Sequence, residues 1–368
     1  MKRKVLLMGR SGSGKTSMRS LIFSTYRAED TKRLGSTIEV EHSHVRFLGN
    51  LVLNLWDCGG QKTYMDSYMD AQRGHVFSSV GVLIYVFDLV ATVDPDDDRR
   101  EWESDLRNYK DIVSALKEYS PGAQVFCLLH KMDLIDPARR EELYKSRVID
   151  LQRATREGAG VEVDNKKTNN APPMRLHCFA TSIWDATLYR AWSAIIHVLI
   201  PDTAKLGTRL AQLAQTCSAT EAVIFEKATF LAILSYSTDP CAKLATAELP
   251  LWSTDDAQIM SGFPASLAPG GGQRPPWELP ESRFERISDI VKQFNKASVG
   301  TEHPFQALEL RTATMTVLLD RLTLSTYILI VTTDPRIRVY NANPELSAIK
   351  RCIEQSRPYF EDHAVSAT

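Results

Sequence analysis

The feature that most restricts the fold of this 368-residue chain is a glycine-rich octapeptide near its start. A short apolar run, Lys4–Met8, precedes the sequence GRSGSGKT at Gly9–Thr16, and a helical apolar pattern with Met18, Leu21 and Ile22 follows it. This order matches the strand–loop–helix setting in which G-x-x-x-x-G-K-[ST] binds nucleotide phosphates. The alternative, a Gly- and Ser-rich turn that matches by chance, would not require a strand before the loop and a helix after it.

The octapeptide predicts a specific set of contacts. Its glycines let backbone N–H groups converge on phosphate oxygens, and the helix N-terminus adds its dipole. We expect Lys15 to reach the β- and γ-phosphates and the Thr16 hydroxyl to bind Mg²⁺. The nucleotide-binding residues expected from this segment are Arg10, Ser11, Gly12, Ser13, Gly14, Lys15, Thr16 and Ser17.

A second segment narrows the class of P-loop protein. The apolar run Leu51–Trp56 leads directly into DCGGQ at residues 57–61. In this position Asp57 can hold Mg²⁺ through water, the Gly60 backbone N–H can sense the γ-phosphate, and Gln61 can orient the attacking water. A plain polar turn is the alternative interpretation.

A third segment indicates which nucleotide base the chain would bind. The apolar run Gln124–Leu129 ends in HKMD at residues 130–133. The Asp133 carboxylate can accept hydrogen bonds from the ring N–H and the exocyclic amine of guanine, and adenine offers no such pair of donors. The methylene stem of Lys131 can lie over the base.

The alternation of apolar runs with helical patterns predicts an α/β fold in the first half. Short runs rich in Val, Leu, Ile and Phe alternate with amphipathic stretches, which favours a mostly parallel sheet with helices on both faces. These runs are Lys4–Met8, Leu51–Trp56, Val80–Asp88, Gln124–His130 and Leu176–Ala180.

Pro201 marks the expected end of this first domain, so we predict domains at 1–200 and 201–368. The second half begins with a helical pattern and continues with β-rich runs, typical of a small α+β domain with an antiparallel sheet. These runs are Val223–Leu234, Thr312–Leu319 and Tyr327–Thr332, with a helix expected through Ile287 and Phe294. A Pro- and Gly-rich stretch around 255–280 predicts a flexible insertion.

Charge and hydropathy exclude two functional classes. With 44 Lys and Arg against 45 Asp and Glu, the chain lacks the basic surplus of a dedicated nucleic-acid binder. No apolar window approaches the roughly 18–20 residues of a membrane span. Lys2 excludes N-myristoylation and the terminal sequence VSAT excludes prenylation, so we expect no direct membrane insertion.

The motifs together resemble the Ras-like small GTPases, and within them the Rag family, specifically its RagA/RagB-type subunit and the fungal counterpart. The resemblance is strongest in the first half and extends to the second by architecture. The segments that carry it are Gly9–Thr16, Thr37–Leu51, Trp56–Gln61, His130–Asp133 and Thr181–Asp185.

The resemblance implies a Ras-like G domain with a six-stranded sheet, followed by a roadblock-like dimerisation domain. It also implies roles at further positions. Thr37 would be the switch threonine that meets Mg²⁺ and the γ-phosphate, and Ser182 and Ile183 would contact the base. His130 occupies the place of the Asn in the Ras-type Asn-Lys-x-Asp motif, so guanine preference would depend mainly on Asp133.

The activity implied is GTP binding and slow GTP hydrolysis to GDP, with Mg²⁺ as cofactor and stimulation by a GTPase-activating protein. The implied partners are a RagC/RagD-type GTPase, bound through the C-terminal domain, a membrane-tethering scaffold complex and the TOR kinase complex. Such a heterodimer signals amino-acid sufficiency at the vacuole or lysosome surface, reached from the cytoplasm through partners, with the nucleus as a second location.

Two alternatives stay open on the sequence. A catalytically quiet subunit could use nucleotide only to stabilise a constitutive dimer. A P-loop kinase is disfavoured by Asp57–Gln61 and by Lys131 and Asp133. On pattern alone, a self-contained C-terminal core and a dimerisation surface explain the apolar faces of the second half equally well.

Overall fold

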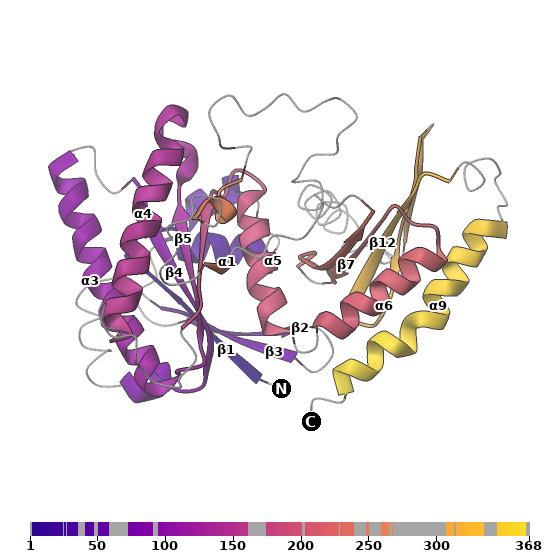
Figure 1. Ribbon diagram of the computed structural model, residues 1–368, viewed down its shortest axis with the longest axis horizontal. Helices are drawn as coiled ribbons and strands as arrows, with labels where there is room; N and C mark the ends of the chain where they lie inside the picture. Colours follow the sequence, from indigo (N-terminus) through magenta and orange to yellow (C-terminus); the bar gives the residue numbers. More distant parts are fainter. Residues whose placement is uncertain are drawn as a thin grey trace, which may run out of the picture.

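The computed structural model describes residues 2–24, 26, 28–35, 41–47, 51–58, 73–90, 95–160, 174–200, 203–227, 229–238, 248–249, 259–264, 267, 307–312, 314–334 and 344–365. Two sheets organise this part of the chain, each with its own covering helices (Figure 1).

The first sheet has the strand order β2-β3-β1-β4-β5-β6-β9. The strands from β3 to β6 are parallel to one another, and β2 and β9 pair antiparallel at the two edges. The expected six-stranded, mostly parallel sheet is therefore confirmed, with the two-residue β9 added. The strands are β1 Lys2–Met8, β2 Glu41–Phe47, β3 Leu51–Asp57, β4 Val80–Asp88, β5 Gln124–His130, β6 Leu176–Thr181 and β9 Glu248–Leu249.

Helices cover both faces of this sheet, as the sequence predicted. Successive residues of a strand point to opposite faces, so Leu7 packs with α1 and α5 while Leu6 packs with α3 and α4. The helices are α1 Lys15–Phe23, α3 Pro95–Tyr119, α4 Pro137–Gly158 and α5 Thr187–Leu199, with 3-10 turns η1 Glu29–Arg33 and η2 Met132–Leu134.

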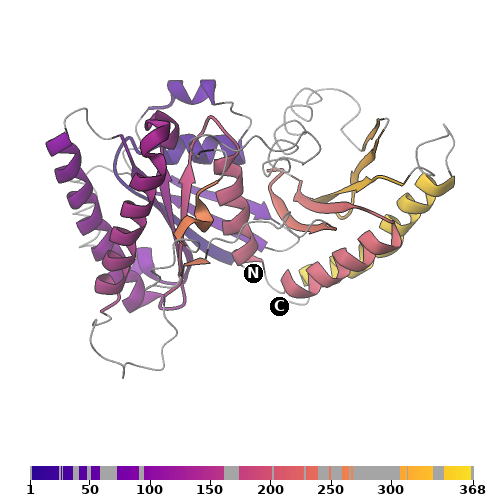
Figure 2. The same ribbon diagram turned by 45° about the horizontal axis from the view of Figure 1, so that its top comes forward.

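The second sheet is antiparallel throughout, in the order β10-β11-β12-β7-β8. Two helices, α6 Thr203–Thr216 and α9 Pro344–Val365, pack against it (Figure 2). Their apolar residues, such as Leu210 and Ile353, join a core that continues into α5 of the first sheet. The strands are β7 Glu221–Glu226, β8 Ala232–Ser237, β10 Leu308–Arg311, β11 Thr316–Arg321 and β12 Thr326–Thr332.

The structure differs from the sequence expectation at Val223–Leu234. This apolar run is two strands, β7 and β8, joined by a turn in which the Glu226 carboxylate accepts the backbone N–H of Thr229 at 2.7 Å. The turn contains neither Gly nor Pro, so the pattern did not mark it. The helix expected through Ile287 and Phe294 lies outside the described residues.

The stretch predicted as flexible, around 255–280, is described at residues 259–264 and 267. There it contains the 3-10 turn η3, Met260–Gly262, and packs against the first sheet. The sequence did not anticipate this packing. The boundary expected near Pro201 falls between α5 and α6, outside the described residues, and stays a prediction.

None of the helices in the described part of the chain combines the length and the apolar character needed to cross a membrane.

Candidate nucleotide-binding site

The predicted site residues meet at one edge of the first sheet because parallel strands end on the same side. The strand register aligns Leu7 of β1 with Asp57, and His130 at the end of β5 with both Asp88 and Thr181. The loops that follow β1, β3, β4, β5 and β6 therefore lie next to one another. In open α/β sheets this edge is where ligands bind.

The octapeptide forms the loop between β1 and α1, with Lys15 as the first helical residue. The Lys15 ammonium group is buried and donates to the carbonyl oxygens of Gly9, at 2.8 Å, and Arg10, at 2.7 Å. Burial lowers the pKa of Lys15, and the nearby Asp57 carboxylate opposes that shift. The Lys15 cation is thus held against the start of the loop by two carbonyl oxygens.

Asp57, the last residue of β3, is fully buried beside α1. Its Oδ2 accepts a hydrogen bond from the Thr16 hydroxyl at 3.0 Å and lies 3.3 Å from the Arg19 Nε. Burial raises the pKa of Asp57, and Arg19 and then Thr16 counteract the shift. The arrangement places one carboxylate and one hydroxyl next to each other in front of the phosphate-binding loop.

This oxygen pair fits Mg²⁺. The second carboxylate oxygen, Oδ1, is buried and accepts no hydrogen bond from the described residues, so it can accept one from a metal-bound water. Mg²⁺ prefers oxygen ligands, keeps several waters and takes few ligands from the protein.

His130 lies under the phosphate-binding loop and is almost fully buried. Its Nδ1 is 3.1 Å from the Thr181 Oγ1, and a Cβ atom on Gly14 would come within 3.0 Å of the ring. Burial, followed by the charge of Lys131, lowers its pKa to about 3, so the imidazole is neutral. His130 was expected among the nucleotide-binding residues, and the structure shows it supporting the loops from below.

Lys131 connects the loop after β5 to two other segments. Its ammonium group donates to the Gly12 carbonyl oxygen at 3.0 Å and to the Asp88 Oδ2 at 2.7 Å. Lys131 has a left-handed backbone, with φ of 63°, and Asp133 follows in the 3-10 turn η2. The segment predicted to contact the base and the loop between β1 and α1 are therefore joined by a side chain as well as by the sheet.

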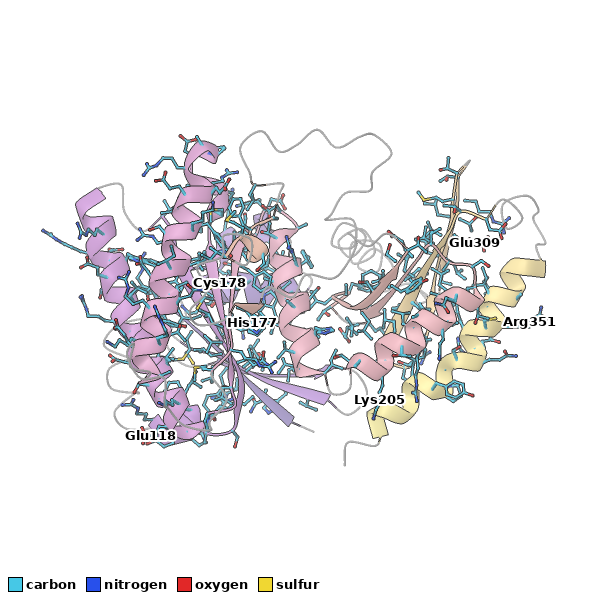
Figure 3. The ribbon with its side chains drawn as sticks, in the orientation of Figure 1. Glu118, His177, Cys178, Lys205, Glu309 and Arg351 are labelled. Carbon is cyan, nitrogen blue, oxygen red and sulfur yellow. The ribbon has the colours of Figure 1, made fainter. Side chains whose placement is uncertain are left out.

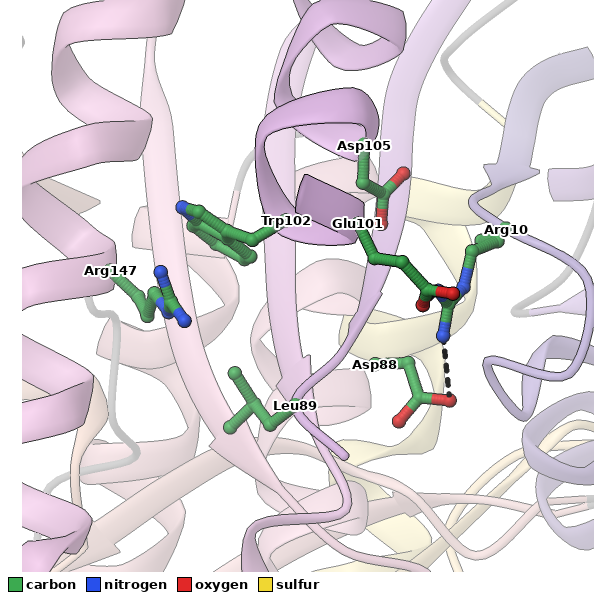
Figure 4. A pocket seen from close by; sticks show the side chains of 7 residues that line it. All are labelled: Arg10, Asp88, Leu89, Glu101, Trp102, Asp105 and Arg147. Carbon is green, nitrogen blue, oxygen red and sulfur yellow. Dashed lines mark hydrogen bonds and ion pairs between the residues drawn. The ribbon is translucent and has the colours of Figure 1, made fainter. Parts of the chain in front are cut away.

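Arg10 turns its side chain away from the loop and toward α3. It pairs with Glu101, and its Nη2 lies 3.6 Å from the Asp88 Oδ2 (Figure 4). Asp88, at the end of β4, thus forms ion pairs with both Arg10 and Lys131. The same small pocket contains the buried Asp105, whose pKa is raised to about 6 mainly by burial.

Ser182 and Ile183 lie in the turn between β6 and α5. Ser182 is buried, its backbone N–H donates to the Thr187 Oγ1 at 2.9 Å, and its hydroxyl accepts from the Trp184 backbone at 3.0 Å. These bonds fix the shape of the loop that presents Ile183.

Three predicted residues, Thr37, Gly60 and Gln61, lie outside the described residues, so their roles stay predictions. Two others were missed. Arg19 follows Thr16 by three positions, so helical spacing places both on one face of α1 and could have indicated it. Asp88 ends a predicted strand at the ligand-binding edge, and that position was its only signal.

A model of the Gtr1/RagA G protein conserved region matches residues 4–291. The chain belongs to the Gtr1/RagA family. It is 42% identical to Ras-related GTP-binding protein A of Dictyostelium discoideum, over 98% of this chain and 97% of that protein. It is 41% identical to GTP-binding protein gtr1 of Schizosaccharomyces pombe, over 97% of each chain.

Similarity to GTR2-type GTP-binding proteins is weaker. The chain is 28% identical to GTP-binding protein GTR2 of Saccharomyces cerevisiae, over 61% of this chain and 59% of that protein. The resemblance noted from the motifs is therefore confirmed at the level of the Gtr1/RagA type. As a member of this G protein family, the chain is a GTP-binding molecular switch and a GTPase.

Proposed function

We propose that the chain binds guanine nucleotide at the edge of its first sheet, with Arg10–Ser17 on the phosphates and Lys131, Asp133 and Ile183 on the base. The observation that carries this proposal is the hydrogen bond from the Lys131 ammonium to the Gly12 carbonyl, which joins the two recognition segments. Thr37 and Gly60 complete the phosphate side, and Ser182 shapes the loop that presents Ile183.

Thr16, Thr37 and, through water, Asp57 would hold Mg²⁺, which when bound would neutralise phosphate charge. Thr16 and Asp57 are already aligned by their 3.0 Å hydrogen bond. Lys15 contributes a second positive charge inside the loop. Gln61 orients the water that attacks the γ-phosphate, and loss of that phosphate releases the segments that contain Thr37 and Gly60.

The Asp133 carboxylate carries the selectivity for guanine, because it accepts from both N–H groups of the base edge. The test is Asp133→Asn in the full chain. The amide presents a donor to the base, so GDP affinity should fall and xanthosine diphosphate affinity should rise. Asp111→Asn, an exposed change on α3, is the matched control and should alter neither affinity. Retained GDP preference in Asp133→Asn would exclude this role.

We further propose that the chain works as a heterodimer with a RagC/RagD-type GTPase. Similarity to the GTR2 protein supports a second, related subunit. The bulk apolar residues of the second sheet, such as Phe225 and Leu329, are buried within this chain. Pairing through the C-terminal half would therefore use sheet edges or helix surfaces, where Leu310, Leu324 and Tyr359 are exposed.

Co-expression with a GTR2-type subunit, followed by size-exclusion chromatography with light scattering, tests this. A one-to-one complex is expected. A full-length chain that stays monomeric beside a folded GTR2-type subunit would contradict the heterodimer.

In the cell, we propose that the heterodimer signals amino-acid sufficiency to the TOR kinase complex at the vacuole or lysosome surface. The first domain, 1–200, would switch, and the second, 201–368, would pair. A scaffold complex would tether it, and a GTPase-activating protein would stimulate hydrolysis. A fluorescently tagged chain should leave that membrane when the scaffold is deleted, and retention there would contradict tethering through partners.

The alternative from the sequence is a catalytically quiet subunit. Measuring phosphate release over several turnovers distinguishes it from a subunit that hydrolyses GTP. Multiple turnovers in the presence of the activating protein are expected, because membership of this G protein family favours hydrolysis. A single turnover at most would favour the quiet subunit.

A further inference from the structure

A segment that lies between two strands of the second sheet packs on the first sheet. Strand β9 pairs antiparallel with β6, aligning Glu248 with His177 and Leu249 with Leu176. The segment then continues through η3, and Ile259, Phe263 and Leu267 are 2%, 7% and 6% exposed, respectively. All three lie in the core formed by α3, α4 and one face of the first sheet.

The closest approach is at Gly262. A Cβ atom on Gly262 would lie 1.7 Å from the Cys178 carbonyl oxygen and 2.5 Å from the Tyr144 hydroxyl oxygen. That hydroxyl donates to the same carbonyl oxygen at 3.0 Å, and the Tyr144 ring lies 5.2 Å from the Phe263 ring. Only glycine lets the segment reach this point on β6, where Figure 3 labels Cys178.

The segment is also attached to α5. The Arg190 guanidinium donates to the Ser261 carbonyl oxygen at 3.1 Å. Because β6 ends at Thr181 and α5 begins at Thr187, the loop with Ser182 and Ile183 lies between the two attachment points. The segment therefore holds the strand before this loop and the helix after it.

We infer that Ile259–Phe263 is a positioning element for the base-contacting loop and slows the release of guanine nucleotide. The inference rests on the proposed base contact of Ile183. A loop fixed at both ends loses less conformational freedom when ligand binds, so its contacts hold ligand more tightly. Packing of this segment of the C-terminal half would then affect nucleotide binding at the loop with Ser182 and Ile183, 76 or more residues earlier in the chain. The effect would pass through Cys178 and Arg190.

The experiment compares Gly262→Ala with Gly207→Ala in the full chain. A Cβ atom on Gly207, in α6, would meet nothing within 4 Å, so this variant is the matched control. Release of a fluorescent GDP analogue is followed after addition of excess GDP, and hydrogen exchange is followed by mass spectrometry. We expect about three- to tenfold faster release for Gly262→Ala, with faster exchange in Leu176–Ala186 and unchanged exchange in β1 and α1.

Arg190→Met provides a second test that introduces no steric conflict, in case Gly262→Ala does not fold. It removes one donor to Ser261 and keeps most of the side-chain stem. Arg153→Met, at an exposed position on α4, is its control. Release should accelerate about two- to fivefold in Arg190→Met and remain unchanged in Arg153→Met.

Release within twofold of the wild-type rate in both test variants would overturn the inference. So would equal acceleration of exchange in β1, since that marks general destabilisation. Faster exchange around β6 with unchanged release would also overturn it. Failure of the proposed function is distinguishable, because Asp133→Asn tests guanine recognition without disturbing this segment.

Discussion

The Lys131 ammonium group and the Asp88 carboxylate form an ion pair at 2.7 Å between the ends of two neighbouring strands. The same Asp88 oxygen lies 3.6 Å from the Arg10 guanidinium, so it faces one cation from the segment proposed to contact the base and one from the loop proposed to bind the phosphates. The Asp88 side chain is 5% exposed. It therefore aligns the two segments that a nucleotide would bridge.

Asp88→Asn should weaken guanine-nucleotide binding. The amide keeps the shape but removes the charge that both cations face. Lys131 and Arg10 are 30% and 28% exposed, so solvent screens part of the effect. We expect a loss of about 1 kcal/mol, roughly fivefold in GDP dissociation constant, by titration with a fluorescent analogue. Asp111→Asn, exposed on α3, should bind like the wild type, and equal affinity in Asp88→Asn would refute the alignment role.

Gly14→Ala should destabilise the nucleotide-free protein more than Gly12→Ala. Both glycines have positive φ, +93° and +79°, so each alanine costs about 1 kcal/mol of backbone strain. Only at Gly14 does the new Cβ atom also press on the His130 ring, at 3.0 Å, whereas Gly12 faces open space. Urea unfolding should show about 1 kcal/mol more loss for Gly14→Ala. Equal losses of unfolding free energy in the two variants would mean that the His130 ring moves aside without cost.

Two buried groups should give opposite pH dependences of stability. His130 has a folded pKa of about 3 against about 6.5 unfolded, so the unfolded state binds more protons and stability falls as pH drops below about 6.5. Asp105 has a folded pKa of about 6 against about 3.9 unfolded, so the folded state binds more protons and stability rises as pH drops from 6 to 4.

In the window from pH 6 to 4 the two contributions offset each other, at up to about 1.4 kcal/mol per pH unit each. Relative to the wild type, His130→Asn should therefore become more stable as pH is lowered through this window, and Asp105→Asn less stable. Urea unfolding of nucleotide-free protein at several pH values measures both. Other titrating groups are common to the three proteins, so parallel profiles would contradict the assignment.

Thr16→Asn should abolish the Mg²⁺ dependence of GTP binding. The Thr16 hydroxyl lies 3.0 Å from Asp57 and is the expected metal ligand, and Thr16→Ser keeps that oxygen. GTP affinity should fall on chelation of Mg²⁺ for the wild type and Thr16→Ser, and it should already be low and insensitive to chelation for Thr16→Asn. Tight, Mg²⁺-dependent binding by Thr16→Asn would refute the metal assignment.

Gln61→Leu should lower GTP hydrolysis and leave GTP binding intact, because leucine cannot orient water. Gln61 lies outside the described residues, so this prediction comes from the sequence and the family. Phosphate release in the presence of the activating protein is the measurement. Wild-type turnover by the variant would exclude the proposed role.

Local patterns predicted the first half of the fold well. Strands β4 and β5 begin and end where their apolar runs do, because both are central strands covered on two sides. In the second half, helix α6 was equally visible, since apolar residues at helical spacing, Leu206, Leu210 and Leu213, are among those that α6 buries. By contrast, the β7–β8 turn depends on a hydrogen bond from the Thr229 backbone N–H to the Glu226 carboxylate. The spacing of apolar residues gives no indication of such a hydrogen bond.

The sequence by itself determined the α/β alternation of the first half and the family resemblance, and it predicted the phosphate-binding loop and the residues that would recognise guanine. These features depend on short segments of sequence, in which the spacing of glycines, charged residues and apolar residues directly indicates a loop, a strand or a helix. Only the tertiary structure decided that Asp88 receives Arg10 and Lys131, that His130 supports Gly14, and that Gly262 contacts Cys178. Each of those contacts joins residues dozens of positions apart, and strand order and packing set their distances.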